Sequence, residues 1–358
     1  MTRTPSDLLR NWSSVLGYQA LGFIAMIVTS MLATVAVPPR VFGDYYFLIS
    51  LIQVALAIAL SWIAQAVALF ARREVQQDGS GSQAFASAVA AQVLVFLPVV
   101  AMAWVAWQVA PQAFPGSNQT FMLLITTLAL FAVLESVSYA LQAMHRFEGI
   151  GMCTALAKVG PLAAVLAVGA GAPATADVLL LGTAIGVVVA LAAAYRVVPA
   201  GYLVSSQPRW QTIADIFAYG WRPPIAGAAA VVSSWMHIWF VRAYGGPAEA
   251  GVYAWAASLH LVAAAALMSL SSVMAPDLID LAPKEDRKGA HRRLNQFQTA
   301  AAMLAIALPA AMGCIRFLAI ALPTRYAAAG PVLALLIATV PAQLMTILSG
   351  PPDAPTRT

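Results

Sequence analysis

The stretch PPRVFGDYYFLIS, residues 38–50, interrupts a long apolar run with two prolines, an arginine and a Gly-Asp pair. A similar stretch, GPAEAGVYAWAAS, occupies residues 246–258. At an offset of 208 positions the two copies share five residues: Pro39 and Pro247, Gly43 and Gly251, Tyr45 and Tyr253, Ser50 and Ser258, and Leu51 and Leu259. This matched spacing indicates an internal repeat, which sets the plan of the whole chain.

Each copy is predicted to form the outer turn between two membrane helices. Gly43 and Gly251 permit a tight bend, because glycine has no Cβ to restrict its backbone. Tyr45 and Tyr253 suit the headgroup boundary, where the ring is half-buried and the hydroxyl meets water. The alternative is that any outer hairpin carries such residues without a repeat, and the matched spacing favours the repeat.

The composition requires an apolar environment around the chain. Of its 358 residues, 61% are hydrophobic and only 9% are charged, with a mean hydropathy of +0.81. Soluble domains carry about 25% charged residues. A core cannot absorb this excess of apolar side chains, so the surface must face lipid. Cys153 and Cys314 lie far apart and form no CxxC pair, so we expect no disulfide framework and no metal site at these cysteines.

Apolar stretches long enough to cross the hydrocarbon core, which takes about 20 helical residues, recur along the chain. They cover residues 12–37, 45–70, 84–110, 120–143, 151–170, 177–199, 216–241, 250–275, 298–321 and 328–349. They are too long for barrel strands of about 10 residues and lack alternation. The predicted fold class is all-α, a polytopic membrane protein with about ten transmembrane helices.

The basic residues predict the orientation. Of the 19 Lys and Arg residues, thirteen fall in one set of loops, and the opposite set holds only Arg40, Arg242 and Arg325. Loops rich in Lys and Arg face the cytoplasm. We therefore expect both termini to be cytoplasmic.

The repeat also predicts the arrangement of the helices. Six spans separate the two copies, so both copies have the same orientation and the repeat is parallel. The chain is expected to form two lobes around a central cavity, residues 1–205 with helices 1–6 and residues 206–358 with helices 7–10. The second lobe is expected to be incomplete, lacking about two helices.

Three segments, taken in order, resemble the polysaccharide flippases of the multidrug/oligosaccharidyl-lipid/polysaccharide exporter superfamily. Residues 38–74 resemble that family's first hairpin, with a Phe-Gly-x-Tyr turn and a basic end. Residues 217–258 resemble the start of its second lobe, and residues 322–350 resemble its helix 9–10 hairpin. The chain departs from the family by having Pro-Pro-Arg where Leu-Gly-Pro is more usual.

The resemblance implies a transporter in the bacterial inner membrane. It would move an undecaprenyl-pyrophosphate-linked oligosaccharide by alternating access, during the synthesis of lipopolysaccharide or exopolysaccharide. Its partners would be the lipid bilayer, the lipid-linked oligosaccharide and glycan-assembly membrane proteins. The alternatives are a drug or cation antiporter of the same superfamily, and a truncated, non-transporting copy or scaffold. Residues 12–37 contain no acid, which disfavours the antiporter.

Ionisable residues inside spans are costly and usually face a cavity or a partner. In the fourth span Glu135, Tyr139 and Gln142 share one helical face, and Lys158 lies at similar depth in the fifth span. We expect an ion pair between Glu135 and Lys158. It either pins two helices together or lines the cavity and changes during transport.

Other cavity candidates are Arg222 and His237, which share a face of the seventh span, and Arg316 in the ninth. Pro223 and Pro224 are hinge candidates, because tandem prolines remove two backbone donors. The alternative is that Arg222 reaches the interface while the prolines occupy a first helical turn. The surplus of intramembrane cations suits a pyrophosphate headgroup.

The sequence contains no GxSxG, HExxH, GxGxxG or GxxxxGK[ST] motif. It therefore predicts a protein that is not an enzyme, without catalytic residues, cofactor or metal site. A short basic patch at residues 276–296 reads as a cytoplasmic loop, and nucleic-acid binding is not expected.

Overall fold

A computed structural model describes residues 5–78, 81–198, 202, 207–220, 224–261, 299 and 326–336. All regular elements in these residues are helical, which confirms the predicted all-α class. They are α1 (Pro5–Ala36), α2 (Pro39–Ala55), the π-helical turn η1 (Leu56–Leu60), α3 (Ser61–Asp78), α4 (Ser82–Val109), the 3-10 turn η2 (Pro111–Ala113), α5 (Asn118–Ala143), α6 (Phe147–Gly169), α7 (Ala176–Val197), α8 (Trp210–Gly220) and α9 (Pro224–Gly245). Helical residues 247–261 and 329–336 follow.

Within the described residues, 6 helices are long and apolar enough to cross a membrane. They are Gly17–Ala36, Pro39–Gln76, Ser82–Val109, Asn118–Ala143, Phe147–Gly169 and Ala176–Val197, in agreement with the first six predicted spans. The seventh predicted span is divided between α8 and α9. The last three predicted spans lie mostly outside the described residues.

Local sequence signals fix where several of these helices begin. Pro39 is the first residue of α2, where a proline loses no helical hydrogen bond. The Ser117 hydroxyl caps α5 by accepting from the Gln119 amide at 3.2 Å, and the Thr120 hydroxyl accepts from the Ser117 amide at 2.9 Å. Thr175 caps α7 by accepting from the Val178 amide. These local residues therefore set where α2, α5 and α7 begin.

The opening stretch does not form the turn that its glycine and tyrosines predicted. The chain reverses at Val37 and Pro38, and Gly43 lies inside α2 and is buried. Tyr45 is also buried, with its hydroxyl 2.9 Å from the Thr183 hydroxyl of α7. The prediction that Gly43 makes the bend was therefore wrong, as was the prediction that the Tyr45 ring is half-buried with its hydroxyl in water.

Gly43 is instead a contact between the two copies of the repeat. A Cβ added to Gly43 would overlap the Pro247 carbonyl oxygen and lie 2.7 Å from the Gly251 nitrogen. A Cβ added to Gly251 would in turn overlap the Pro39 carbonyl oxygen and lie 3.0 Å from the Gly43 nitrogen. The two glycines let the first turns of these helices touch backbone to backbone.

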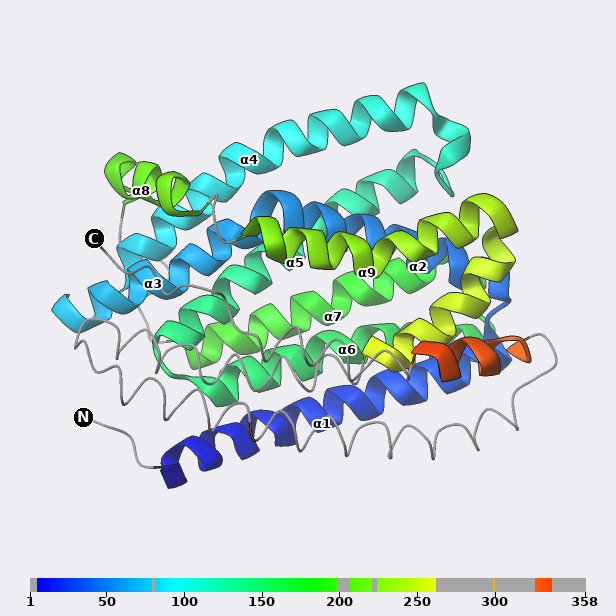
Figure 1. The fold of residues 1–358 in the computed structure, drawn as a ribbon, viewed down its shortest axis with the longest axis horizontal. Helices are drawn as coiled ribbons and strands as arrows, with labels where there is room; N and C mark the ends of the chain where they lie inside the picture. Colours follow the sequence, from blue (N-terminus) through cyan, green and yellow to red (C-terminus); the bar gives the residue numbers. More distant parts are fainter. Residues whose placement is uncertain are drawn as a thin grey trace. The chain divides into compact units, whose positions relative to one another are not determined.

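Figure 1 shows the helices of the first compact unit, which ends at Ala254. In this unit α1 packs mainly against α6, and α6 also packs against α7. α5 lies against α3 and α7, and α2 contacts α9.

The second unit begins at Trp255, whose buried ring lies 6.5 Å from that of Tyr326. The division into two lobes, 1–205 and 206–358, remains a prediction.

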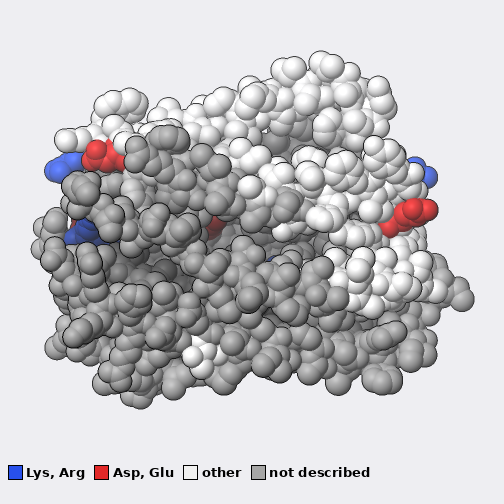
Figure 2. All heavy atoms as spheres, in the orientation of Figure 1, with Lys and Arg blue, Asp and Glu red and all other residues white. Residues whose placement is uncertain are grey.

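The charges of the described residues follow the pattern of a membrane protein. On the face drawn in Figure 2, the coloured Lys, Arg, Asp and Glu atoms lie mostly toward its two ends, and the described surface between them, where it is visible, is largely white. Apolar side chains such as Leu21, Ile24 and Val35 of α1 are exposed. These surfaces face lipid in a membrane, so their exposure carries no penalty.

Close packing between α6 and α7 gives a first prediction. A Cβ on Gly160 would overlap the Gly182 carbonyl oxygen and lie 2.6 Å from the Gly186 nitrogen. We expect Gly160→Ala to destabilise the purified protein by about 1–3 kcal/mol, because backbone atoms cannot move aside as a side chain would. Thermal unfolding in detergent measures this. Gly17→Ala is the matched control, because nothing lies within 4 Å of its Cβ position; equal stability of the two variants would contradict the prediction.

Candidate functional site

The carboxylate of Glu135 lies within α5, one of the membrane-length helices. It is half-buried, and its Oε2 accepts a hydrogen bond from the Ser61 hydroxyl at 2.8 Å. Ser61 is the first residue of α3. A carboxyl group at membrane depth is costly to place there, and such groups usually serve a function.

Tyr139 continues the same interface one helical turn further along α5. Its hydroxyl is hydrogen-bonded to the Gln65 side chain of α3. Ser61 and Gln65 are four residues apart, as are Glu135 and Tyr139, so each pair stacks on one helix face. We call these four residues the α3–α5 ladder. Towards the end of both helices, the Arg72 guanidinium donates to the Ala143 carbonyl at 3.2 Å, which closes the interface.

The π-helical turn η1 explains why the ladder forms. On a regular helix Ser50, Gln53, Ser61 and Gln65 would share one face. A π-helical turn takes more residues than an α-helical one, so it rotates the residues that follow it. Ser61 and Gln65 consequently face α5, whereas Ser50 accepts a hydrogen bond from the Trp239 indole of α9 at 2.7 Å. Polar residues that a regular helix would place on one face therefore contact two different helices, α5 and α9.

The predicted ion pair between Glu135 and Lys158 is not formed. Lys158 lies on α6 and packs against α1, where a Cβ on Gly22 would be 3.6 Å from its Cγ. Glu135 faces α3 instead. The reason is the packing order: α6 lies chiefly against α1 and α7, and α5 chiefly against α3 and α7. The two residues therefore face different helices.

The other predicted site residues are not part of the ladder. Gln142 is buried in α5. His237 of α9 is exposed, and its ring stacks on that of Tyr253 with centroids 6.3 Å apart. Pro224 is the first residue of α9, where proline is well tolerated. Arg222, Pro223 and Arg316 lie outside the described residues, so the hinge stays a prediction.

A second polar contact was missed from the sequence. Arg242 of α9 forms an ion pair with Asp44 of α2, and its guanidinium lies 4.6 Å from the centroid of the Phe47 ring. Arg242 looked like an ordinary loop cation, because the end of the seventh span was placed at residue 241. Its partner, Asp44, could not be predicted from the sequence, because the two residues meet only where the helices of the two repeat copies come into contact.

Groups of three or more His, Cys, Asp or Glu placed to hold a metal ion were not found within the described ranges. The chemistry that the ladder offers is that of a single carboxyl group with hydroxyl and amide neighbours. Such a group takes up and releases a proton or pairs with a cation.

No protein-family model matches the sequence, and no curated protein does. Solved structures do match. The MATE multidrug transporter DinF-BH, solved in complex with a ligand, superimposes with a TM-score of 0.62 at 13% identity, covering 86% of this chain and 72% of that one. An outward-facing multidrug resistance MATE family transporter of the MOP superfamily gives a TM-score of 0.65 at 13% identity, covering 97% and 84%.

The chain has the fold of a MATE transporter. A MATE structure in the straight conformation agrees, with a TM-score of 0.63 at 14% identity over 98% of this chain and 83% of that one. At 13–14% identity this likeness concerns the fold, and it agrees with the membrane-transporter fold expected from the sequence. The first two of these structures are multidrug transporters. The comparison therefore does not support the narrower expectation of a polysaccharide flippase.

The Ser61–Glu135 hydrogen bond gives a second prediction. We expect Ser61→Ala to lower the stability by about 1–3 kcal/mol, because a half-buried carboxyl group would lose its donor. Ser138→Ala is the control, since its hydroxyl donates only within α5, to the Leu134 carbonyl at 2.8 Å. Thermal unfolding in detergent distinguishes them, and a larger loss for Ser138→Ala would show that Ser61 does not support Glu135.

Proposed function

We propose that the chain is an inner-membrane antiporter that exports amphiphilic, drug-like organic molecules by alternating access, with Glu135 as its coupling group. The observation that carries this proposal is the α3–α5 ladder: a carboxyl group at membrane depth in a MATE fold, held by Ser61 and without a basic partner among the described residues. A multidrug transporter of this fold has been solved with a ligand bound.

Glu135 has no lysine or arginine beside it among the described residues. A lysine or arginine beside it would hold it ionised and fixed in an ion pair. With the Ser61 hydroxyl as its hydrogen-bond partner in the described part of the chain, the carboxyl group can exist protonated, or ionised when a cation lies beside it. Exchange between these states ties the occupancy of the site to a proton or cation gradient, which an antiporter requires. Residues 12–37 contain no acid, so in this proposal Glu135 of α5 serves as the intramembrane acid of the antiporter.

A second candidate is export of a lipid-linked oligosaccharide. The resemblance of residues 38–74 and 217–258 to polysaccharide flippases favours it, as does Lys158, an intramembrane cation without an ion pair in the described part of the chain. A pyrophosphate headgroup needs cations to offset its desolvation. In this role the chain would work beside glycan-assembly membrane proteins. A scaffold that transports nothing is the remaining alternative.

Drug export gives the third prediction. Expression of the chain in a bacterium without its own efflux pumps should raise resistance to cationic dyes, and Glu135→Gln should abolish that gain. The amide keeps the size of the side chain but cannot ionise. Glu148→Gln, which changes an exposed carboxylate in the first turn of α6, is the matched control and should behave as the wild type. Full resistance with Glu135→Gln would show that Glu135 does not couple transport.

The oligosaccharide candidate is separated by complementation. A strain that lacks its polysaccharide flippase should not regain surface polysaccharide when it expresses this chain, if drug export is correct. Rescue that is lost with Lys158→Ala would instead establish the second candidate. Neither resistance nor rescue, with the protein present in the membrane, would favour the scaffold.

A further inference from the structure

The two copies of the repeat meet at one end of the first compact unit. The helices that begin at Pro39 and Pro247 touch through Gly43 and Gly251, and each glycine faces the carbonyl oxygen of the other helix's proline. The contact is reciprocal, as expected at the axis of a parallel repeat. Nothing bulkier than hydrogen fits between the two backbones.

Polar and aromatic contacts surround this glycine crossing. Asp44, next to Gly43, forms the ion pair with Arg242, and the two side chains are only 19% and 16% exposed. The Arg242 guanidinium also lies over the Phe47 ring. Such an arrangement satisfies a cation from two sides, by charge and by the face of a ring.

A further hydrogen bond lies on the same pair of helices. The Trp239 indole of α9 donates to the Ser50 hydroxyl of α2 at 2.7 Å, and that hydroxyl donates to the Phe47 carbonyl at 2.6 Å. Ser50 is fully buried. Arg242 and Trp239 are three residues apart, so both contacts come from one face of α9.

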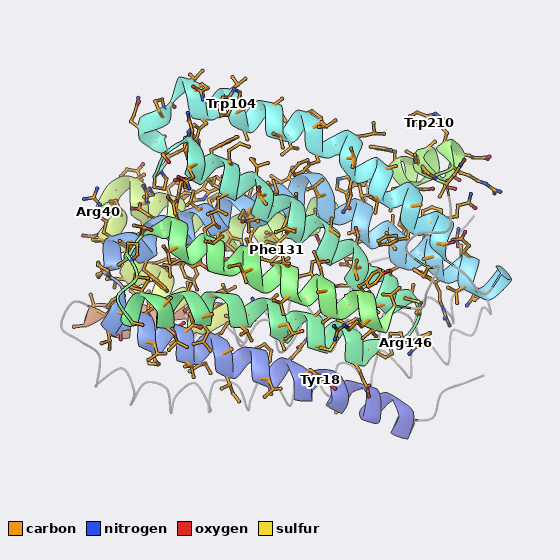
Figure 3. The ribbon with its side chains drawn as sticks, turned by 180° about the vertical axis from the view of Figure 1, so that it is seen from behind. Tyr18, Arg40, Trp104, Phe131, Arg146 and Trp210 are labelled. Carbon is orange, nitrogen blue, oxygen red and sulfur yellow. The ribbon has the colours of Figure 1, made fainter. Side chains whose placement is uncertain are left out.

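This cluster lies at the end of the unit that is expected to face away from the cytoplasm. Figure 3 shows Arg40, in the first turn of α2, at the opposite end of the helices from Arg146. Arg40 and Arg242 belong to the sparse set of basic residues, and Arg146 to the abundant one. The contacts between α2 and α9 therefore close the predicted outer end.

We propose that Asp44, Arg242, Ser50 and Trp239, with the glycine crossing, form an outer gate that opens and closes during transport. The inference rests on the proposed transport function and adds the element that controls access from outside. Among the described residues, moving α2 away from α9 and from the helix that begins at Pro247 breaks the Asp44–Arg242 ion pair, the contact of Arg242 with the Phe47 ring and the Trp239–Ser50 hydrogen bond, and it separates the two glycine backbones. Asp44 lies in the second turn of α2, near the predicted outer surface, where water can take the place of its ion pair as the helices part.

The test measures the gate by distance, independently of transport. Spin labels are attached at Arg40→Cys and Glu249→Cys, two exposed positions in the first turns of the gating helices, in a chain with Cys153→Ala and Cys314→Ala. Pulsed electron resonance in lipid vesicles then gives the distribution of distances. We expect one short distance for this background, and about tenfold more of a longer distance with Asp44→Asn or Arg242→Gln.

Charge reversal makes the result specific. Asp44→Arg combined with Arg242→Asp should restore the short distance, because the pair is rebuilt with its charges exchanged. Arg73→Gln is the matched control: this arginine also lies over a ring, that of Phe70, but at the other end of the long helix that starts at Pro39. It should leave the distances unchanged. Identical distributions for Asp44→Asn, Arg242→Gln and the background would overturn the gate.

A covalent lock links the gate to transport. A short thiol cross-linker between Asp44→Cys and Arg242→Cys should stop dye export, and reduction of the link should restore it. Full export by the cross-linked chain would overturn the proposal. Absence of export from every form, together with the expected change in distance, would refute the transport function but leave the gate standing.

Discussion

Helices in a membrane gain little by burying apolar side chains against one another, because lipid is just as apolar. Their association depends on how closely the backbones approach and on a few polar bonds. This constraint accounts for the main contacts of the first unit. Gly160 meets Gly182 and Gly186, and Gly43 meets Gly251, each without room for a methyl group. The polar bonds at the ladder and at the gate then select which helix faces which.

The parts of the fold that follow from composition and periodicity could be predicted. The first six spans, the all-α class and the significance of residues 38–50 were evident because lipid imposes long apolar runs. The role of Gly43 was not, since a glycine in a turn and a glycine in a helix crossing look the same in sequence. Only the structure shows that its partner is its own repeat equivalent, Gly251.

Only part of the candidate site could be predicted from the sequence. Helical phase correctly grouped Glu135 with Tyr139, because a regular helix fixes which residues share a face. It could not name the neighbour of that face, and the choice of Lys158 was wrong because α5 and α6 each pack chiefly on other helices. Helical phase also does not extend across η1, where the helix is not regular. Ser61 and Gln65 of the ladder and Asp44 and Ser50 of the outer gate lie on the two sides of that irregularity, on the same long helix.

The π-helical turn at Leu56–Leu60 has a consequence for how this chain varies and how its relatives are aligned. Residues before the turn interact with α9, and residues after it interact with α5. A single inserted or deleted residue here would change the span by only about 1.5 Å in length but would rotate one half relative to the other by roughly 100°. After such a change, residues that face the same neighbour on one side of the turn would face different neighbours on the other side. The two halves of this membrane helix can therefore change their contacts separately.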